Sequence, residues 1–330
     1  MSTLFLIGNG FDLNCGMKTA YTDIYPGYIN ESSISKVIST FKQNISSQID
    51  TWGDFEMAMA DYAKTLNSES QLLECVRDFS FYVNDYLAKE ELAIREYLKD
   101  SEVMNLVTQE MYNSFRDFYL DCSHNINHIM QERLASVFNN ISAISFNYTQ
   151  TFDTIFNQLR SLHGLSYISV THIHGLLDED PVLGIDNESQ LNVSYPISKK
   201  AKRGFIKPFF NECYDRNRVR YTLDRIQMAS TICTYGLSLG DSDLTWRNAL
   251  LSWLDENDNH HLFIYDYRYS TIYCKTVSER LDIEDDAKEK LLAKWGVNSN
   301  IDSLLEQIHI PIAKNIFNIK PCFKHLSIAQ

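Results

Sequence analysis

The chain has 330 residues, a formal net charge of -13 and 44% hydrophobic residues, which is enough to bury a large core as one big domain or two smaller ones. The negative charge argues against a surface built mainly to grip nucleic acid. Its seven cysteines include no CxxC pair, which argues against a zinc ribbon and fits a reducing cytoplasm. No apolar run reaches the length of a membrane span. We therefore expect a cytoplasmic protein with no membrane partner.

The stretch from Leu4 to Asp12 organises the predicted fold. Residues 4–7 are four consecutive apolar residues, which is typical of a strand buried on both faces in a parallel sheet and not of a signal peptide, because no basic region precedes them. Gly8-Asn9-Gly10 then permits a tight turn, and residues 13–19 can open a helix. This arrangement cradles phosphates in nucleotide-binding proteins, but it is equally typical of any first strand–helix turn.

A long helical block is predicted after this unit. Tyr25-Pro26-Gly27-Tyr28 marks a break, and residues 54–134 contain neither glycine nor proline, with aromatic residues recurring at helical spacing. Asp54 is expected to cap a helix, and the spacing leaves open whether Glu56 has a role at the site. We therefore divide the chain into a first strand and glycine turn (1–32), a helical insertion (33–135) and the remainder of the α/β domain with C-terminal helices (136–330).

The sheet is predicted to resume after the insertion. Further strands are expected at residues 141–146, 167–173, 230–235 and 261–266, with helices at 246–254, 276–295 and 301–308. The only basic cluster comprises Lys199, Lys200, Lys202, Arg203 and Lys207, in a loop-rich region at 178–217. It is interpreted either as a solvated loop or as a lid that carries cations toward an anionic ligand.

Small or polar residues follow four of the predicted strands. They are Gly8-Asn9-Gly10, Asn147, His174-Gly175 and Gly236-Leu237-Ser238. Each feature alone is weak, because a lone histidine or asparagine at such a place is often structural. Open parallel sheets bind ligands outside the carboxyl ends of their strands, so the joint placement predicts a nucleotide site on a Rossmann-like parallel sheet.

These motifs carry a resemblance to a known family. Gly8-Asn9-Gly10-Phe11-Asp12-Leu13, Phe146-Asn147-Tyr148-Thr149, His172-Ile173-His174-Gly175 and the run from Gly236 to Asp243 resemble the AbiH family, which takes its name from bacterial abortive infection against phage. Their order is similar to that of the wider SIR2-like group, whose members bind NAD. The resemblance implies a SIR2-like fold and a role in antiviral defence. A phage-derived trigger and a homo-oligomer are open alternatives that the sequence does not decide.

The resemblance also implies roles for individual residues. Gly8 and Gly10 would face the phosphates of NAD, Asn147 would hold the nicotinamide ribose, and His174 would be the general base. The dinucleotide would also contact the residues Asn9, Phe11, Asp12, Gly236, Ser238 and Asp241. The four-cysteine zinc module of sirtuin deacylases has no counterpart in this sequence, so deacylation is not implied.

The chemistry of the residues leads to the same hypothesis. Cleavage of the nicotinamide–ribose bond builds positive charge on the ribose and needs oriented hydroxyls, a dry pocket and a base for water. Asn147 can both donate to and accept from a hydroxyl, and His174 titrates near neutrality. Asp12 or Asp241 is expected to orient the imidazole or to favour the cationic transition state. The first hypothesis is therefore an NAD-hydrolysing effector.

Two other functions are consistent with the sequence. His172 and His174 share one predicted strand face, and with Asp186 or Asp241 they could ligate a divalent ion in a metal-dependent phosphoesterase or nuclease. A nucleotide-binding sensor that acts through a partner, without turnover, is the third hypothesis. Ordered metal would favour the second, and binding without turnover would favour the third.

Overall fold

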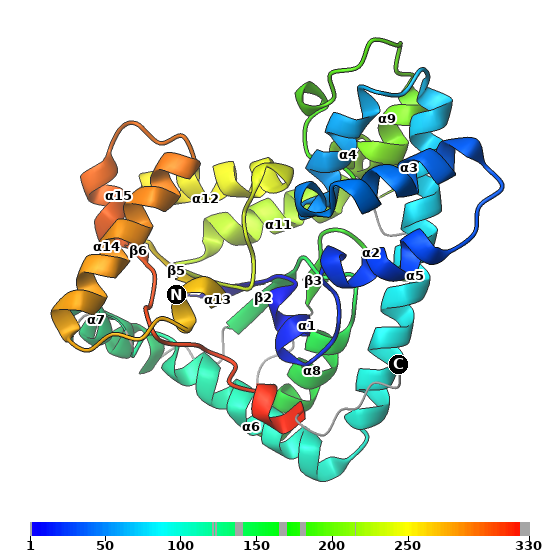
Figure 1. Cartoon of the computed structure of the whole chain (residues 1–330). Coiled ribbons are helices and arrows are strands. Elements are labelled where there is room, and N and C mark those ends of the chain that lie inside the picture. The colour runs from blue at the N-terminus through cyan, green and yellow to red at the C-terminus, as the bar shows by residue number, and fades with distance from the viewer. Residues whose placement is uncertain are drawn as a thin grey trace.

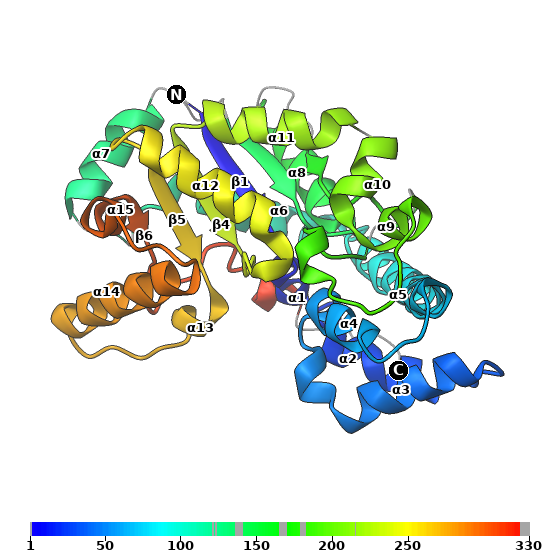
Figure 2. The ribbon, with the colours of Figure 1, turned by 90° about the horizontal axis from the view of Figure 1, so that it is seen from above.

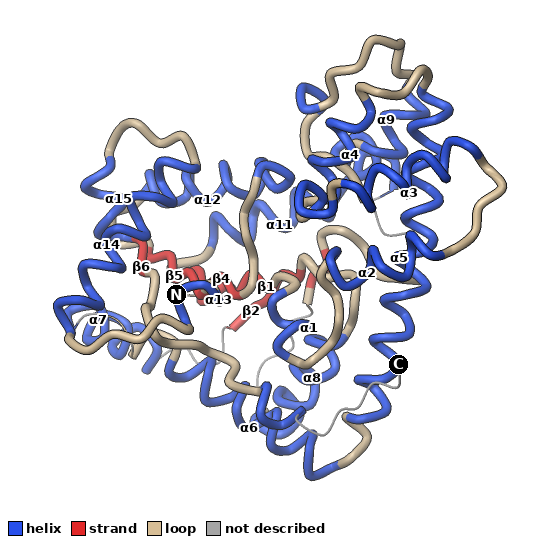
Figure 3. Tube along the Cα trace, in the orientation of Figure 1, coloured by secondary structure: helices blue, strands red, loops and turns tan. Residues whose placement is uncertain are grey.

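The computed structural model describes residues 2–120, 122, 124–135, 141–164, 170–178, 183–214 and 216–323. Its centre is a six-stranded sheet in the order β3-β2-β1-β4-β5-β6, in which every pair of neighbouring strands is parallel. Figure 3 shows this sheet in red, surrounded by helices. The strands are β1 (Thr3–Ile7), β2 (Ile141–Ser145), β3 (Thr171–His172), β4 (Thr231–Tyr235), β5 (His261–Tyr265) and β6 (Ile308–His309).

The central strands confirm the predicted parallel α/β fold. All five residues of β1, β2, β4 and β5 are buried, as expected for strands covered by helices on both faces. In register, Ile7 lies opposite Ser145 of β2 on one side and Tyr235 of β4 on the other. The turns after these three strands therefore leave the sheet side by side at one edge.

The block after β1 is helical, as predicted, but its helices serve two cores. Its elements are α2 (Tyr21–Asn30), α3 (Lys36–Ser47), η1 (Ile49–Trp52), α4 (Phe55–Ala63), α5 (Glu69–Tyr97), α6 (Ser101–Asp117) and α7 (His124–Ala135). Figure 1 shows α2, α3 and α4 gathered away from the sheet, while α6 and α7 run beneath it. The 29-residue helix α5 joins the two regions.

The remaining helices cover the sheet and close its ends. They are α1 (Gly10–Asn14), α8 (Thr151–His163), η3 (Glu188–Gln190), α9 (Lys199–Phe205), α10 (Lys207–Tyr214), α11 (Arg216–Met228), η4 (Asp241–Asp243), α12 (Leu244–Glu256), α13 (Tyr267–Ser270), α14 (Val277–Lys294), α15 (Ile301–Gln307) and η5 (Lys320–Phe323). Figure 2 shows α11 and α12 lying across one face of the sheet, with α6 on the opposite face.

Aromatic residues dominate two of the three hydrophobic cores. Beneath the sheet, Phe5 packs edge-to-face against Phe115 and Phe118, with ring centroids 4.6 and 5.4 Å apart. In the core of α2–α5, Phe79 stacks on Phe55 at 4.2 Å. Each such pair adds about 0.5–1.5 kcal/mol to the area it buries. The expectation that these aromatics form core is confirmed.

Two local predictions were wrong. The segment Tyr25-Pro26-Gly27-Tyr28 lies inside α2, because packing of both tyrosines in the core outweighs the loss of one helical hydrogen bond at Pro26. A Cβ on Gly27 would stand 2.1 Å from Tyr82 Oη, so this glycine serves close packing and not a turn.

The region predicted to be loop contains α9, α10 and the start of α11, and Ser198 caps α9 by accepting from the Ala201 amide. The helix predicted at 301–308 is confirmed as α15, which ends at Gln307, but the short strand β6 that begins at Ile308 was not predicted. Two paired residues are too few to produce a periodic signal. Residues 167–169 of the predicted third strand lie outside the described residues.

Candidate functional site

A cavity of about 510 Å³ lies at the carboxyl ends of the strands. It opens where the strand order reverses between β1 and β4, which is where open α/β sheets bind ligands. Its walls come from the turns after β1, β2, β3, β4 and β5, from α4, and from the start of α10. Its volume lies within the ~300–1,000 Å³ of small-molecule sites.

Glycines bring the turns after β1 and β4 into backbone contact. The amide of Gly8 donates to Tyr235 O at 2.9 Å, and that of Gly10 donates to Gly236 O at 3.1 Å. A Cβ on Gly10 would lie 2.4 Å from Gly236 Cα, and Gly236 has φ +62°. The two turns can meet only because both positions lack a side chain. These two amides are thus already engaged, whereas phosphate contact remains a prediction.

Most of the predicted site residues line the cavity. They are Asn9, Gly10, Asp12, Asn147, His174, Gly236 and Ser238. The lining does not include Gly8, Phe11 or Asp241. Phe11 is fully buried in the core against Phe152, 5.0 Å away, and Asp241 pairs with Arg247 at 3.0 Å. The Asn9 amide is held by hydrogen bonds to Thr19.

Asp12 and Asn147 place buried, unpartnered polar atoms at the cavity. Asp12 is 2% exposed and Asn147 is 5% exposed. Thr149 Oγ1 donates to Asp12 Oδ2 at 2.6 Å, but within the described part of the chain Asp12 Oδ1 and both amide atoms of Asn147 lack a partner with hydrogen-bond geometry. Burial raises the pKa of Asp12 to about 7, opposed by Thr149 and the nearby Asn147 amide. Such orphaned groups are costly unless a ligand or water satisfies them.

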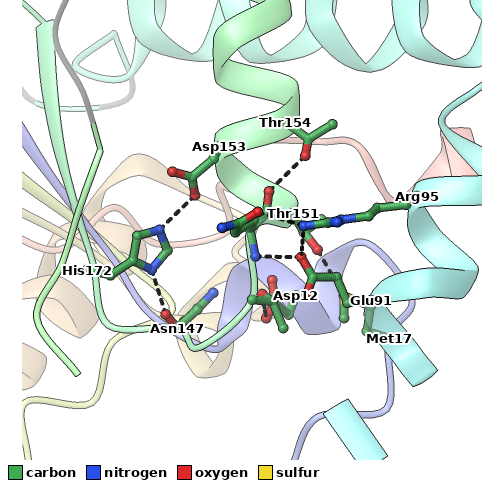
Figure 4. Close-up of polar contacts among 11 residues, drawn as sticks. Asp12, Met17, Glu91, Arg95, Asn147, Thr151, Asp153, Thr154 and His172 are labelled. Carbon is green, nitrogen blue, oxygen red and sulfur yellow. Dashed lines mark hydrogen bonds and ion pairs between the residues drawn. The ribbon is translucent and has the colours of Figure 1, made fainter. Parts of the chain in front are cut away.

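His172 binds the backbone carbonyl of Asn147. As Figure 4 shows, its ring lies between the Asn147 carbonyl and the Asp153 carboxylate, at 2.8 Å from Nδ1 and 2.9 Å from Nε2. Burial alone would lower the pKa of His172, but Asp153 and the Asn147 carbonyl raise it. Both partners are acceptors, so the ring donates from both nitrogens, as only the imidazolium does.

His174 is the buried imidazole of the cavity. Its imidazole lies beside the rings of Phe146 and Tyr148, whose centroids are 5.7 and 6.2 Å from its own. Its Nε2 lies 3.8 Å from Asp243 Oδ1. Burial, reinforced by Lys207, lowers the pKa of His174 against the pull of Asp243. A neutral imidazole beside a carboxylate is competent to accept a proton. The prediction that Asp12 or Asp241 orients this ring was wrong, because the carboxylate beside it is Asp243.

Lys207 is a buried cation among carboxylates. Its Nζ donates to Ser242 O at 3.1 Å and lies 3.7 Å from Asp243 Oδ1. Burial alone would lower the pKa of Lys207, but Asp243 and Glu56 raise it. Burial raises the pKa of Glu56 to about 7, although Lys207 opposes the shift. Of the predicted basic cluster, Lys207 therefore reaches the cavity, whereas Lys199 and Lys200 are exposed.

Sequence reasoning missed the position of Asp243 beside His174 and left open the role of Glu56, on α4. Asp54 caps α4 as predicted, but its Oδ2 also accepts from Ser242 Oγ at 3.1 Å. The nearby Glu56 lies in the cavity wall and accepts from Tyr21. The available signal was the run of Asp241, Ser242 and Asp243 after a predicted strand, which places several acids at one sheet edge.

The predicted metal ligands do not converge. Both ring nitrogens of His172 are engaged by Asp153 and Asn147, whereas His174 faces Asp243. Among the described residues, no group of three or more His, Cys, Asp or Glu side chains is arranged to hold a metal ion. Within the same ranges, each helix is too short or too polar to cross a bilayer.

The fold and the cavity define a parallel α/β protein with a polar site at the switch point of its sheet. Residues 4–265 match the family model described as bacteriophage abortive infection AbiH. Because the match covers more than half of the chain, the protein belongs to the AbiH family. A search of curated proteins gave no match.

Proposed function

We propose that the protein is an anti-phage effector that binds NAD and hydrolyses its nicotinamide–ribose bond. The observation that carries the proposal is that the buried residues Asp12 and Asn147, which hold unpartnered polar atoms within the described residues, line the same cavity as the neutral His174. The family match to abortive infection supports the defence role. The resemblance of the strand-end motifs to those of NAD-binding proteins supports the choice of nucleotide.

The charges around the cavity favour a ligand with a cationic end and an anionic group farther along it. The buried wall carries Asp12, Glu56 and Asp243 against one cation, Lys207. The exposed rim carries Lys294 and Arg268, the latter paired with Asp266. NAD has a cationic nicotinamide ring at one end and a diphosphate in the middle, so the ring would enter the acidic interior while the phosphates stay near the rim.

Each residue has a role in the proposed reaction. Asn147 would satisfy its amide by holding a ribose hydroxyl, fixed in place by the His172–Asp153 pair behind it. The Asp12 carboxylate would stabilise the positive charge that builds on the ribose as the C–N bond breaks. His174 would take the proton of the attacking water, with Asp243 stabilising the resulting imidazolium.

Incubation of the purified protein with NAD, ATP and DNA in separate reactions tests the proposal. We expect nicotinamide and ADP-ribose from NAD, and no product from ATP or DNA. His128→Ala is the matched control for His174→Ala. It should keep full activity, because His128 lies on α7 with an exposed side chain. NAD binding without any product would favour the sensor hypothesis, and cleavage of DNA in the presence of a divalent metal would favour the nuclease. A phage-derived factor is added in a parallel reaction to provide the proposed trigger.

A further inference from the structure

A second cavity of about 280 Å³ adjoins the main cavity. It lies between the residues that follow β3 and the helices α10, α11 and α12, which pack against one another in that order (Figure 2). His174 and Lys207 line both cavities. The imidazole proposed as the general base therefore lies where the two cavities meet.

The walls of the second cavity differ from those of the first. Away from His174 and Lys207 they are largely apolar, with Ile173, Val219 and Trp246. Asp186 is held by the backbone amide of Thr245. A polar end next to an apolar chamber fits a small molecule that has one hydroxyl group and a hydrocarbon body.

The second cavity is also larger than a single attacking water molecule requires. A water molecule takes up about 30 Å³ in the liquid, whereas this chamber measures about 280 Å³. Resting on the proposed function, we infer that the second cavity admits an alcohol as acceptor, so that the enzyme transfers ADP-ribose to small hydroxyl compounds as well as to water.

The transfer is balanced without a further reactant. The bond between nicotinamide and ribose C1′ breaks, and its electron pair leaves with nicotinamide as the neutral base. The acceptor oxygen forms a new bond to C1′, and its proton passes to His174. The reaction is a substitution without oxidation or reduction, and a water molecule that attacks C1′ from the main cavity gives free ADP-ribose.

The test is to measure how the products partition between alkyl ADP-ribose and free ADP-ribose when NAD is supplied with methanol, propanol or butanol. Burial in an apolar chamber should raise the alkyl share roughly fourfold with each methylene. Val219→Phe should fill the chamber and lower the butanol share about tenfold. Val219 lines the second cavity and not the first, so NAD consumption in water should stay within about twofold of wild type, the range of a change remote from the chemistry.

Val219→Ala is the matched variant that enlarges the chamber, and it should move the preference toward alcohols longer than butanol. If Val219→Phe does not fold, an unchanged preference in Val219→Ala contradicts the inference by itself. ADP-ribose as the sole product at every alcohol concentration, or equal partition in wild type and Val219→Phe, overturns the acceptor site but leaves the hydrolase standing. No consumption of NAD by the wild-type protein overturns the proposed function, and the acceptor site with it.

Discussion

Replacement of Asp12 by Asn should stabilise the protein at high pH. Asp12 is buried, and its pKa rises from 3.8 to about 7 in the folded state. The folded protein therefore holds this proton more tightly than the unfolded chain, so the free energy of unfolding falls as the pH rises from about 4 to about 7. At 1.36 kcal/mol per pKa unit the full loss is about 4 kcal/mol. An Asn oxygen still accepts from Thr149 Oγ1, so the variant keeps that hydrogen bond.

Urea unfolding at pH 4.5 and pH 8 measures the effect. We expect Asp12→Asn to exceed wild type by about 2–4 kcal/mol at pH 8 and by less than about 1 kcal/mol at pH 4.5, with activity lost because the carboxylate is gone. Glu289→Gln, at an exposed position on α14, is the control and should change the free energy of unfolding equally at pH 4.5 and pH 8. An equal change at both pH values, or destabilisation at pH 8, would refute the reasoning.

Four further substitutions probe the frame of the site. Gly236→Ala should lower the free energy of unfolding by more than the ~1–2 kcal/mol of a left-handed residue, because its Cβ also meets Gly10, and wild-type stability in urea would contradict this. His172→Gln should lower NAD turnover about tenfold or more, because Asn147 is then no longer held in place, and Asp153→Asn should have the same effect. A kcat and a KM equal to those of the wild type would contradict that positioning role. Lys207→Met should lower the free energy of unfolding by about 3–5 kcal/mol at pH 8 and by less at pH 5, where Glu56 is protonated. An equal loss at the two pH values in urea unfolding would count against the buried charge cluster.

The sheet was predictable because its strands are short apolar runs with clear ends. β1, β4 and β5 begin within one residue of the predicted positions. Strand β6 has only two residues, so its sequence shows no periodic pattern. A Pro-Gly pair usually marks a turn, but here it lies inside α2 because Tyr25 and Tyr28 pack in the core. Local propensity is a weak prior against such tertiary contacts.

The candidate site was predictable only where residues follow strands. Parallel strands bring Asn147, His174 and Gly236 to one edge, so chain position alone indicated that they would meet. Glu56 and Lys207 enter the cavity from helices that are distant in sequence. The sequence left a role for each of them open, and the packing of α4 and α10 at the sheet edge places both in the cavity wall. The pairing of His174 with Asp243, two residues beyond the predicted Asp241, depends on the turn of η4.

Comparison of His174→Ala with wild type in one NAD experiment tests the central claim most directly. NAD binding is measured by calorimetry, and nicotinamide release is measured in the same samples. A lost base removes rate but little ground-state binding, so we expect His174→Ala to bind NAD within a few-fold of the wild-type affinity and to release no nicotinamide above background. Full turnover by His174→Ala would contradict the proposed mechanism.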